Sequence, residues 1–317
     1  MNYYDTLFQL IKIGKPNLKE SSIKIYVSNM RKLSQFIGND KFVNVDFLRD
    51  KDTVMESISN KSDNTIKTYL ASIVVVLSVL NKYPNVLKEY RQDMEDIQVE
   101  YNKLLENQQK TPSQEDNWLN YNELILTMLN LKKQVRKDKL FTKEDLTVDE
   151  FNTLQQYVVA CLYLIEPEEN PPVRLDYTPM MVISEKEYNI IEQKEHNYLV
   201  INNTKKKYFV FHDYKTAGTY GDKQIPVGKT LNAVLNKWLK VNTTGYLLIN
   251  NKNEAMSKNS LTKFIQSIFA STGKLVSVSL IRHSYLSDRY AADSADKKMI
   301  ADHMLHSVTM QTDYIKK

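Results

Sequence analysis

Short runs of β-branched and aromatic residues between positions 197 and 227 interrupt a sequence whose patterns are mostly helical. Residues 198–201 and 208–212 are joined by a polar segment, and residues 223–227 follow a glycine-containing turn. Runs of this length, separated by short polar turns, are typical of antiparallel strands. The sequence therefore predicts a mainly α fold with a small antiparallel β-meander.

The first third of the chain has the apolar spacing of packed helices. Apolar residues recur three or four positions apart over residues 23–36, and a further helical pattern runs from Val86 to about Leu105. Asp63 lies where an N-cap is expected, and residues 73–80 are apolar nearly all round, so this helix should lie inside a bundle. We predict a helical domain over residues 1–110.

A polar segment without apolar periodicity, residues 107–116, separates this region from the rest. It contains Pro112 and is the best candidate for a domain boundary, with the linker placed at residues 111–116. The second domain is then expected over residues 117–317, and helical patterns at 118–131 and 147–165 open it.

Composition excludes several classes of protein. A single cysteine rules out an intramolecular disulfide framework and a cysteine-based zinc site, and Cys161 lies in an apolar stretch that predicts a buried thiol. The longest apolar stretch, near residues 71–77, is too short to span a membrane, and the N-terminus lacks a secretory signal. We therefore expect an intracellular protein that is not secreted. The net charge of +5 permits a nucleic-acid partner without requiring one.

Chemistry-bearing residues occur in a fixed order in the second domain. Arg174 precedes the predicted meander, Lys215 lies between its second and third strands, and Arg282, His306 and Tyr314 follow near the C-terminus. This ordered set resembles the signature of tyrosine recombinases of the phage-integrase type, in the form found in integrase-like recombinases of large DNA viruses and mobile elements. The resemblance covers the chain from about residue 18.

The resemblance implies a helical core-binding domain that clamps DNA and an α/β catalytic domain. It also implies site-specific cleavage and rejoining of double-stranded DNA, as in integration, excision or resolution, without metal, ATP or other cofactor. Four protomers would assemble as a homo-tetramer on two DNA sites, with no membrane involved. Two positions depart from the family pattern: Ser279 stands where a histidine is usual, and Leu305 stands where a glycine is usual.

These residue types suit the chemistry of a phosphodiester. Tyr314 would attack phosphorus and keep the bond energy in a 3′-phosphotyrosine. Arg174 and Arg282 would stabilise the charge on the phosphoryl oxygens, because a guanidinium stays charged and matches two oxygens at once. Lys215 would protonate the leaving 5′-oxygen, and His306 would bond a phosphoryl oxygen or accept the tyrosine proton.

Plainer interpretations stand beside these roles. Tyr314 is one of 20 tyrosines, Arg282 on an otherwise apolar helix fits a buried ion-pair partner, and Arg174 fits a partner of Asp176 or Glu168. Lys215 competes with the lysines at 205–207 and Lys223, which fit solvated turns.

In the first domain, Lys24, Arg31 and Lys67 are the candidates for DNA contacts, on helices expected to face the duplex. Two alternative functions remain open: relaxation of DNA by a type IB topoisomerase, and binding of DNA by a catalytically inactive protein. A Tyr314→Phe change would abolish activity in either enzyme and leave a binder unaffected.

Overall fold

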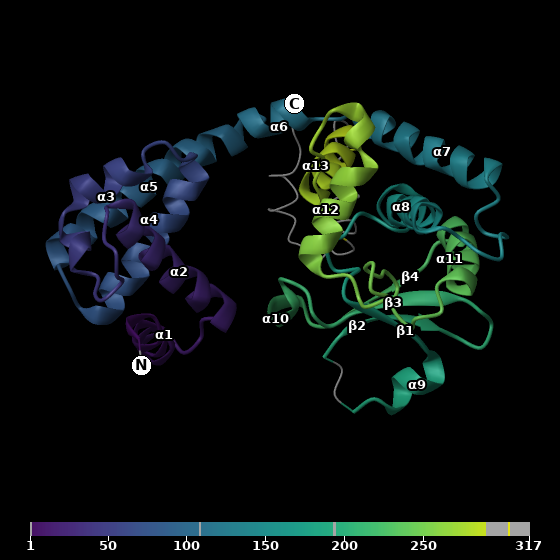
Figure 1. Ribbon diagram of the computed structural model, residues 1–317, viewed down its shortest axis with the longest axis horizontal. Coiled ribbons are helices and arrows are strands. Elements are labelled where there is room, and N and C mark those ends of the chain that lie inside the picture. Colours follow the sequence, from purple (N-terminus) through teal and green to yellow (C-terminus); the bar gives the residue numbers. More distant parts are fainter. Residues whose placement is uncertain (1, 108, 193–194, 290–303, 305–317) are drawn as a thin grey trace. The chain divides into compact units, whose positions relative to one another are not determined.

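The structure is a computed structural model that describes residues 2–107, 109–192, 195–289 and 304 (Figure 1). It divides into two compact units, Met1–Asn107 and Gln108–Lys317. The candidate residues His306 and Tyr314 lie outside the described residues.

The first unit is helical. Its elements are α1 (Tyr3–Gly14), α2 (Glu20–Phe36), the 3₁₀ turn η1 (Asp46–Arg49), α3 (Lys51–Ile58), α4 (Asp63–Leu80) and α5 (Pro84–Glu106). The buried faces of α2 and α4 share one apolar core, which also holds a hydrogen bond of 2.9 Å from Asn29 Nδ2 to Ser72 Oγ. The helices predicted from apolar spacing are present, and α1 and α3 were not predicted.

Helix α4 is long and apolar enough, by length and composition, to cross a membrane. In this structure it packs against α1, α2 and α5, and its residues Leu70, Ile73 and Leu77 are fully buried in the core of the first unit. The left-handed residue Asn81 ends the helix, three residues before α5 begins at Pro84.

The second unit is built around α8 (Val148–Leu164), which is buried over most of its length. Helices α7 (Tyr121–Lys137), α11 (Lys229–Val241) and α12 (Lys258–Ile268) pack against α8, and α13 (Val278–Arg289) packs against α7. Short helices complete it: α6 (Pro112–Asn117), α9 (Glu185–Ile190), α10 (Ala217–Tyr220) and the 3₁₀ turn η2 (Ala270–Thr272). Cys161 is buried on α8, as expected, and this burial raises the pKa of its thiol to about 12.

One four-stranded sheet lies in the second unit, in the order β1 (Met180–Ser184), β2 (Asn197–Ile201), β3 (Lys207–Phe211) and β4 (Lys223–Pro226). Strands β2, β3 and β4 form the predicted antiparallel meander, with Tyr198 opposite Val210 and Tyr208 opposite Pro226. Strand β1 pairs in parallel with β2, so the sheet is mixed and not purely antiparallel. The chain is thus mainly helical with a small sheet, as predicted, and carries one strand more than the meander.

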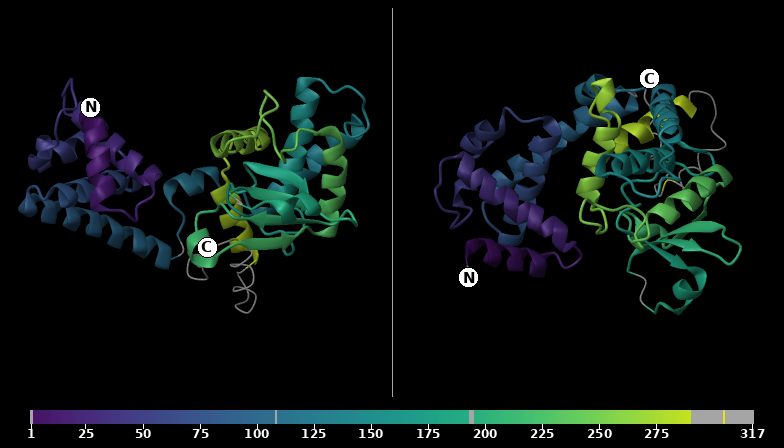
Figure 2. Two further views of the ribbon diagram at one scale, coloured as in Figure 1. Left: turned by 90° about the horizontal axis from the view of Figure 1, so that it is seen from below. Right: turned by 45° about the vertical axis from the view of Figure 1, so that its right-hand side comes forward.

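The two faces of the sheet meet different partners, with α8 on one side and α9 on the other (Figures 1 and 2). Leu199, Phe209 and Phe211 belong to the main core, which includes α8. Tyr198, Val200 and Val210 alternate with them and form a smaller cluster with residues of α9. This alternation fixes the register, because a slip of one residue would exchange the two faces.

The segment expected as a linker, residues 111–116, falls mostly on helix α6. The Thr111 hydroxyl accepts from the Gln114 backbone N–H, the Gln114 side chain accepts from the Thr111 N–H, and Pro112 occupies the first turn. The same reciprocal capping begins α7, α8 and α9.

Candidate functional site

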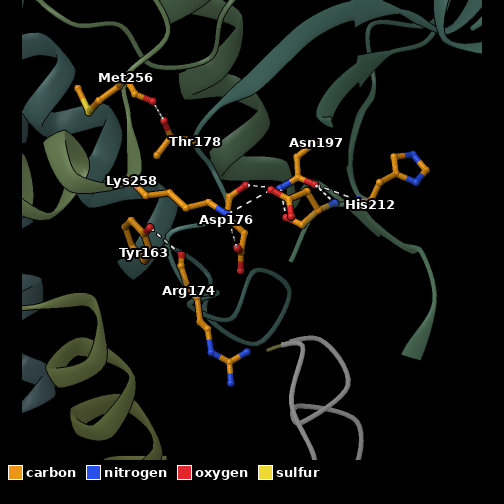
Figure 3. A network of polar contacts seen from close by, with 9 residues as sticks. Tyr163, Arg174, Asp176, Thr178, Asn197, His212, Met256 and Lys258 are labelled. Carbon is orange, nitrogen blue, oxygen red and sulfur yellow. Dashed lines mark hydrogen bonds and ion pairs between the residues drawn. The ribbon is translucent and has the colours of Figure 1, made fainter. Parts of the chain in front are cut away.

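Arg174 lies in the loop between α8 and β1, and a hydrogen bond from α8 fixes its backbone. The hydroxyl of Tyr163, near the end of α8, donates to the Arg174 carbonyl at 2.9 Å. Tyr163 and Tyr177 are buried and meet edge to face, with ring centroids 5.4 Å apart. Figure 3 shows the Arg174 side chain extending away from Tyr163 and Asp176. The loop backbone is thus fixed while the partly exposed guanidinium projects from it.

The first part of the same loop is tied to α11. The Glu166 carboxylate accepts from the backbone N–H groups of Thr230 at 2.9 Å and of Leu231 at 3.4 Å, which are free donors of a helix N-terminus. Asn170 Oδ1 accepts from the Gly228 N–H at 3.2 Å.

Helix α13 holds this loop from a second side. The Tyr285 hydroxyl donates to the Pro167 carbonyl at 3.2 Å, and Arg289 forms an ion pair with Glu168.

Arg282, on α13, is 1% exposed and is the most buried of the predicted site residues that the structure describes. Its Nη1 donates to the Pro172 carbonyl at 3.1 Å and to the Met304 carbonyl at 3.3 Å, and Nη2 donates to the Met304 carbonyl at 3.4 Å. A buried guanidinium is costly unless hydrogen bonds compensate for lost water. The Arg282 bonds to protein carbonyls join α13 to the backbone two residues before Arg174 and two residues before His306.

Asp176 is a buried carboxylate at the centre of the site, 4% exposed. Its Oδ1 lies 3.9 Å from Lys258 Nζ at the start of α12, and the same Nζ lies 3.3 Å from Asp213 Oδ2. Burial raises the pKa of Asp176, and the positive charges of Lys258, Arg174 and Arg282 oppose that rise. Lys258 thus forms the ion pair with Asp176, and Arg174 and Arg282 add positive charge that favours the ionised carboxylate.

Asn197, the first residue of β2, joins the loop of Arg174 to the turn that carries Lys215 (Figure 3). Its Nδ2 donates to the carbonyls of Asp176 and Asp213, and its Oδ1 accepts from the backbone N–H groups of His212 and Asp213, all at 2.9 Å. Lys215 follows two residues later, exposed, in the turn between β3 and α10. Asn197 thus links the loop that carries Arg174 to the residues just before Lys215, and Arg282 binds the same loop at Pro172.

His212 links the start of that turn to Asp222 before β4 and to Tyr188 of α9. Its Nδ1 lies 2.9 Å from Asp222 Oδ1, and its Nε2 lies 3.1 Å from the Tyr188 hydroxyl on α9. The Tyr214 hydroxyl also donates to the Gly221 carbonyl. The turn therefore closes on itself, with Lys215 on its outside.

The lysine run at 205–207 divides in the structure. Lys205 and Lys206 are exposed at the hairpin tip, whereas Lys207 is 4% exposed and donates to Asn232 and Asn236 of α11. Burial lowers the pKa of Lys207. The expectation of a solvated tip therefore fails for Lys207, because α11 covers it.

The other predicted residues lie in different surroundings. Lys24 and Arg31 are exposed on α2 and, seven residues apart, share one face of that helix. Lys67 on α4 is half-buried, donates to Gln98 of α5, and lies 5.9 Å from the Tyr101 ring centroid. Ser279 is exposed on α13.

Sequence reasoning missed the residues that connect the site, chiefly Lys258, Asn197 and Tyr163. Each contacts a segment outside its own helix or strand, so no local pattern marks it. The only signal was Ser257, the N-cap of α12, which places Lys258 in the first turn of a helix. Among the described residues, no group of three or more His, Cys, Asp or Glu side chains is arranged to hold a metal ion.

No family model matches the chain, and no curated protein sequence matches it. Among solved structures, it is similar to the crystal structure of XerA recombinase, with a TM-score of 0.39 and 11% sequence identity, over 100% of this chain and 94% of that chain.

Proposed function

We propose that this chain cleaves and rejoins double-stranded DNA through a 3′-phosphotyrosine intermediate, in the manner of tyrosine recombinases. The observation that carries the proposal is the pair of contacts made by Arg282. Its guanidinium binds the carbonyls of Pro172 and Met304, which stand two positions before Arg174 and two positions before His306 in the sequence, and this supports the proposal.

In the proposed reaction, the Tyr314 hydroxyl attacks phosphorus and the P–O5′ bond breaks. The tyrosine proton passes to His306, and the leaving 5′-oxygen takes a proton from Lys215, giving a 3′-phosphotyrosine and a free 5′-hydroxyl. Arg174 stabilises the charge on the phosphoryl oxygens. Attack by a 5′-hydroxyl on the phosphotyrosine reverses these steps and rejoins the strand.

The fixed network supports this division of roles. The Arg174 backbone is bound by Tyr163, and the Lys215 turn is bound by Asn197 and His212, whereas both cationic side chains extend from these anchors. Reactive cations on rigid backbones meet a phosphate with little reorganisation. We further propose that the first unit clamps the duplex, that four protomers act on two DNA sites, and that the role is integration, excision or resolution of viral or mobile-element DNA.

A second candidate, a DNA-binding protein without cleavage activity, is favoured by one observation. The buried Arg282 directs both terminal nitrogens to carbonyls, as an arginine with a purely structural role would. In that case Arg282 holds the loops and no covalent adduct forms.

An adduct assay separates the two. Full-length protein is mixed in EDTA with nicked duplexes drawn from the DNA that flanks its own gene and with random-sequence nicked duplexes, and SDS-resistant complexes are resolved by gel. The strand-exchange proposal expects an adduct with wild type and none with Tyr314→Phe. Tyr220→Phe, which alters an exposed tyrosine of α10, is the matched control and should form the adduct normally. Tight, salt-sensitive binding without an adduct on any of these duplexes would favour the binder.

A further inference from the structure

A cavity of about 340 Å³ lies between α7, α8 and α11. None of its lining residues belongs to the loops that carry Arg174 or Lys215. Its size lies within the range of small-molecule sites.

The cavity has an aromatic and aliphatic floor. Phe141 and Tyr157 meet edge to face with centroids 6.2 Å apart, and Val135 and Val234 lie beside them. The chain reaches Phe141 through Lys139, whose backbone is left-handed with φ of 52° and which turns the end of α7 back over α8. Such a floor suits a flat apolar group.

Four cations surround this floor: Lys132 and Arg136, one turn apart on α7, Lys139 after the helix end, and Lys237 on α11. Lys237 Nζ lies 5.7 Å from the Phe141 ring centroid. The lining includes no acidic residue, and none of the four cations forms an ion pair within the part of the chain that the structure describes. Like charges four residues apart destabilise a helix, and a bound anion removes that cost.

The charge and the floor together restrict the ligand. One carboxylate carries a single charge and neutralises one of the four cations, whereas a polyphosphate carries several. Lysine is a compact point charge that serves as a phosphate binder. A polyphosphate attached to a flat ring matches both the four cations and the aromatic floor of the cavity.

We propose that this cavity binds a nucleoside di- or triphosphate, with the base on Phe141 and Tyr157 and the phosphates among Lys132, Arg136, Lys139 and Lys237. The site is separate from the proposed strand-exchange reaction and does not depend on it.

The test is fluorescence anisotropy of a fluorescent nucleoside triphosphate with the full chain, in EDTA. The double variant Lys132→Gln/Lys237→Gln should weaken binding by about tenfold or more. The matched control, Lys133→Gln/Lys240→Gln, removes the same charge from exposed positions on the same two helices outside the cavity, and should bind within about twofold of wild type. Equal weakening by both doubles would show non-specific attraction and overturn the proposal, as would absence of binding.

Two further arms test the ligand class. Phe141→Ala should weaken the binding of the nucleoside triphosphate. The affinity of this variant for inorganic triphosphate, measured by competition, should equal that of wild type. If inorganic triphosphate and the nucleoside triphosphate bind equally well to wild type, the proposed contact of the base with Phe141 and Tyr157 is wrong. The two double variants should bind duplex DNA with the same affinity. If Lys132→Gln/Lys237→Gln alone lost affinity for duplex DNA, these cations would belong to a DNA-binding surface and the proposal would be wrong.

Discussion

The environment of Arg282 makes it a residue on which stability depends. Its guanidinium is enclosed and bonded to two backbone carbonyls. Arg282→Lys keeps the charge but has no planar fork to reach both acceptors, so we expect the free energy of unfolding to fall by about 2–4 kcal/mol. Urea unfolding measures this loss. Arg91→Lys, at an exposed arginine of α5, should change stability by less than about 0.5 kcal/mol. An Arg282→Lys protein as stable as wild type would contradict the anchoring role.

Asp176 should give the protein a distinctive pH dependence. Burial raises its pKa in the folded state above the ordinary value of about 3.9 that applies when unfolded. Between the two values the folded state holds more protons, so the contribution of Asp176 to stability falls as pH rises from about 4 and levels off above the folded pKa.

Comparison with Asp176→Asn isolates this group from other carboxylates. The wild-type minus variant difference in unfolding free energy, measured by urea titration at several pH values between about 3 and 7, should decrease with rising pH. A difference that increases with pH would mean that Lys258, Arg174 and Arg282 outweigh the burial, and that the folded pKa is lowered.

Gly228 controls how α11 meets the loop that leads to Arg174. A Cβ at Gly228 would lie 2.4 Å from Asn170 Nδ2 and 2.6 Å from Glu169 Oε2. Gly228→Ala should therefore push these side-chain ends aside, weaken the hydrogen bonds that Asn170 and Glu166 make to α11, and lower the unfolding free energy by about 0.5–1.5 kcal/mol. Gly218→Ala in α10, where nothing lies within 4 Å, is the matched control and should be near neutral. Thermal and urea unfolding of the two variants checks the contrast, and equal effects would show that the contact with Asn170 is unimportant.

Most helices and the meander could be predicted because they follow local rules. Apolar spacing locates α2, α4, α5 and α8, and the β-branched runs locate β2 to β4. Strand β1 escaped because it runs directly into a helix-capping signal, Ser184 with Glu187, and because its parallel pairing with β2 spans the intervening helix α9. Helix α6 carried a recognisable capping box, but its polar composition favoured a linker.

The candidate site was predictable as a list of residue types and not as a network. Arg174, Lys215 and Arg282 come from an ordered motif, whereas the burial of Arg282 against carbonyls, the bridge by Asn197 and the pairing of Lys258 depend on tertiary contacts. The same limit applies to Lys67, whose engagement with Gln98 and Tyr101 depends on how α4 packs on α5.

Over the full chain, DNA binding should depend steeply on salt, because phosphate contacts release counterions. We expect Lys24→Gln/Arg31→Gln to remove two phosphate contacts. The slope of log affinity against log salt concentration should then become shallower by roughly 1.8. Lys67→Gln should change the slope little, because Lys67 is already engaged by α5. Anisotropy of a labelled duplex over a salt series measures both slopes. A larger effect from Lys67 than from the α2 pair would place the DNA-binding face on α4.

The most direct test of strand cleavage is to identify the amino acid that carries the DNA. Wild-type protein is trapped on a nicked duplex in EDTA, the adduct is digested with protease and nuclease, and the modified peptide is sequenced by mass spectrometry. With 20 tyrosines in the chain, the position of the linkage is a stringent criterion. The proposal predicts a nucleotide linked through its 3′-phosphate to Tyr314. A linkage to any other residue, or through a 5′-phosphate, would contradict it.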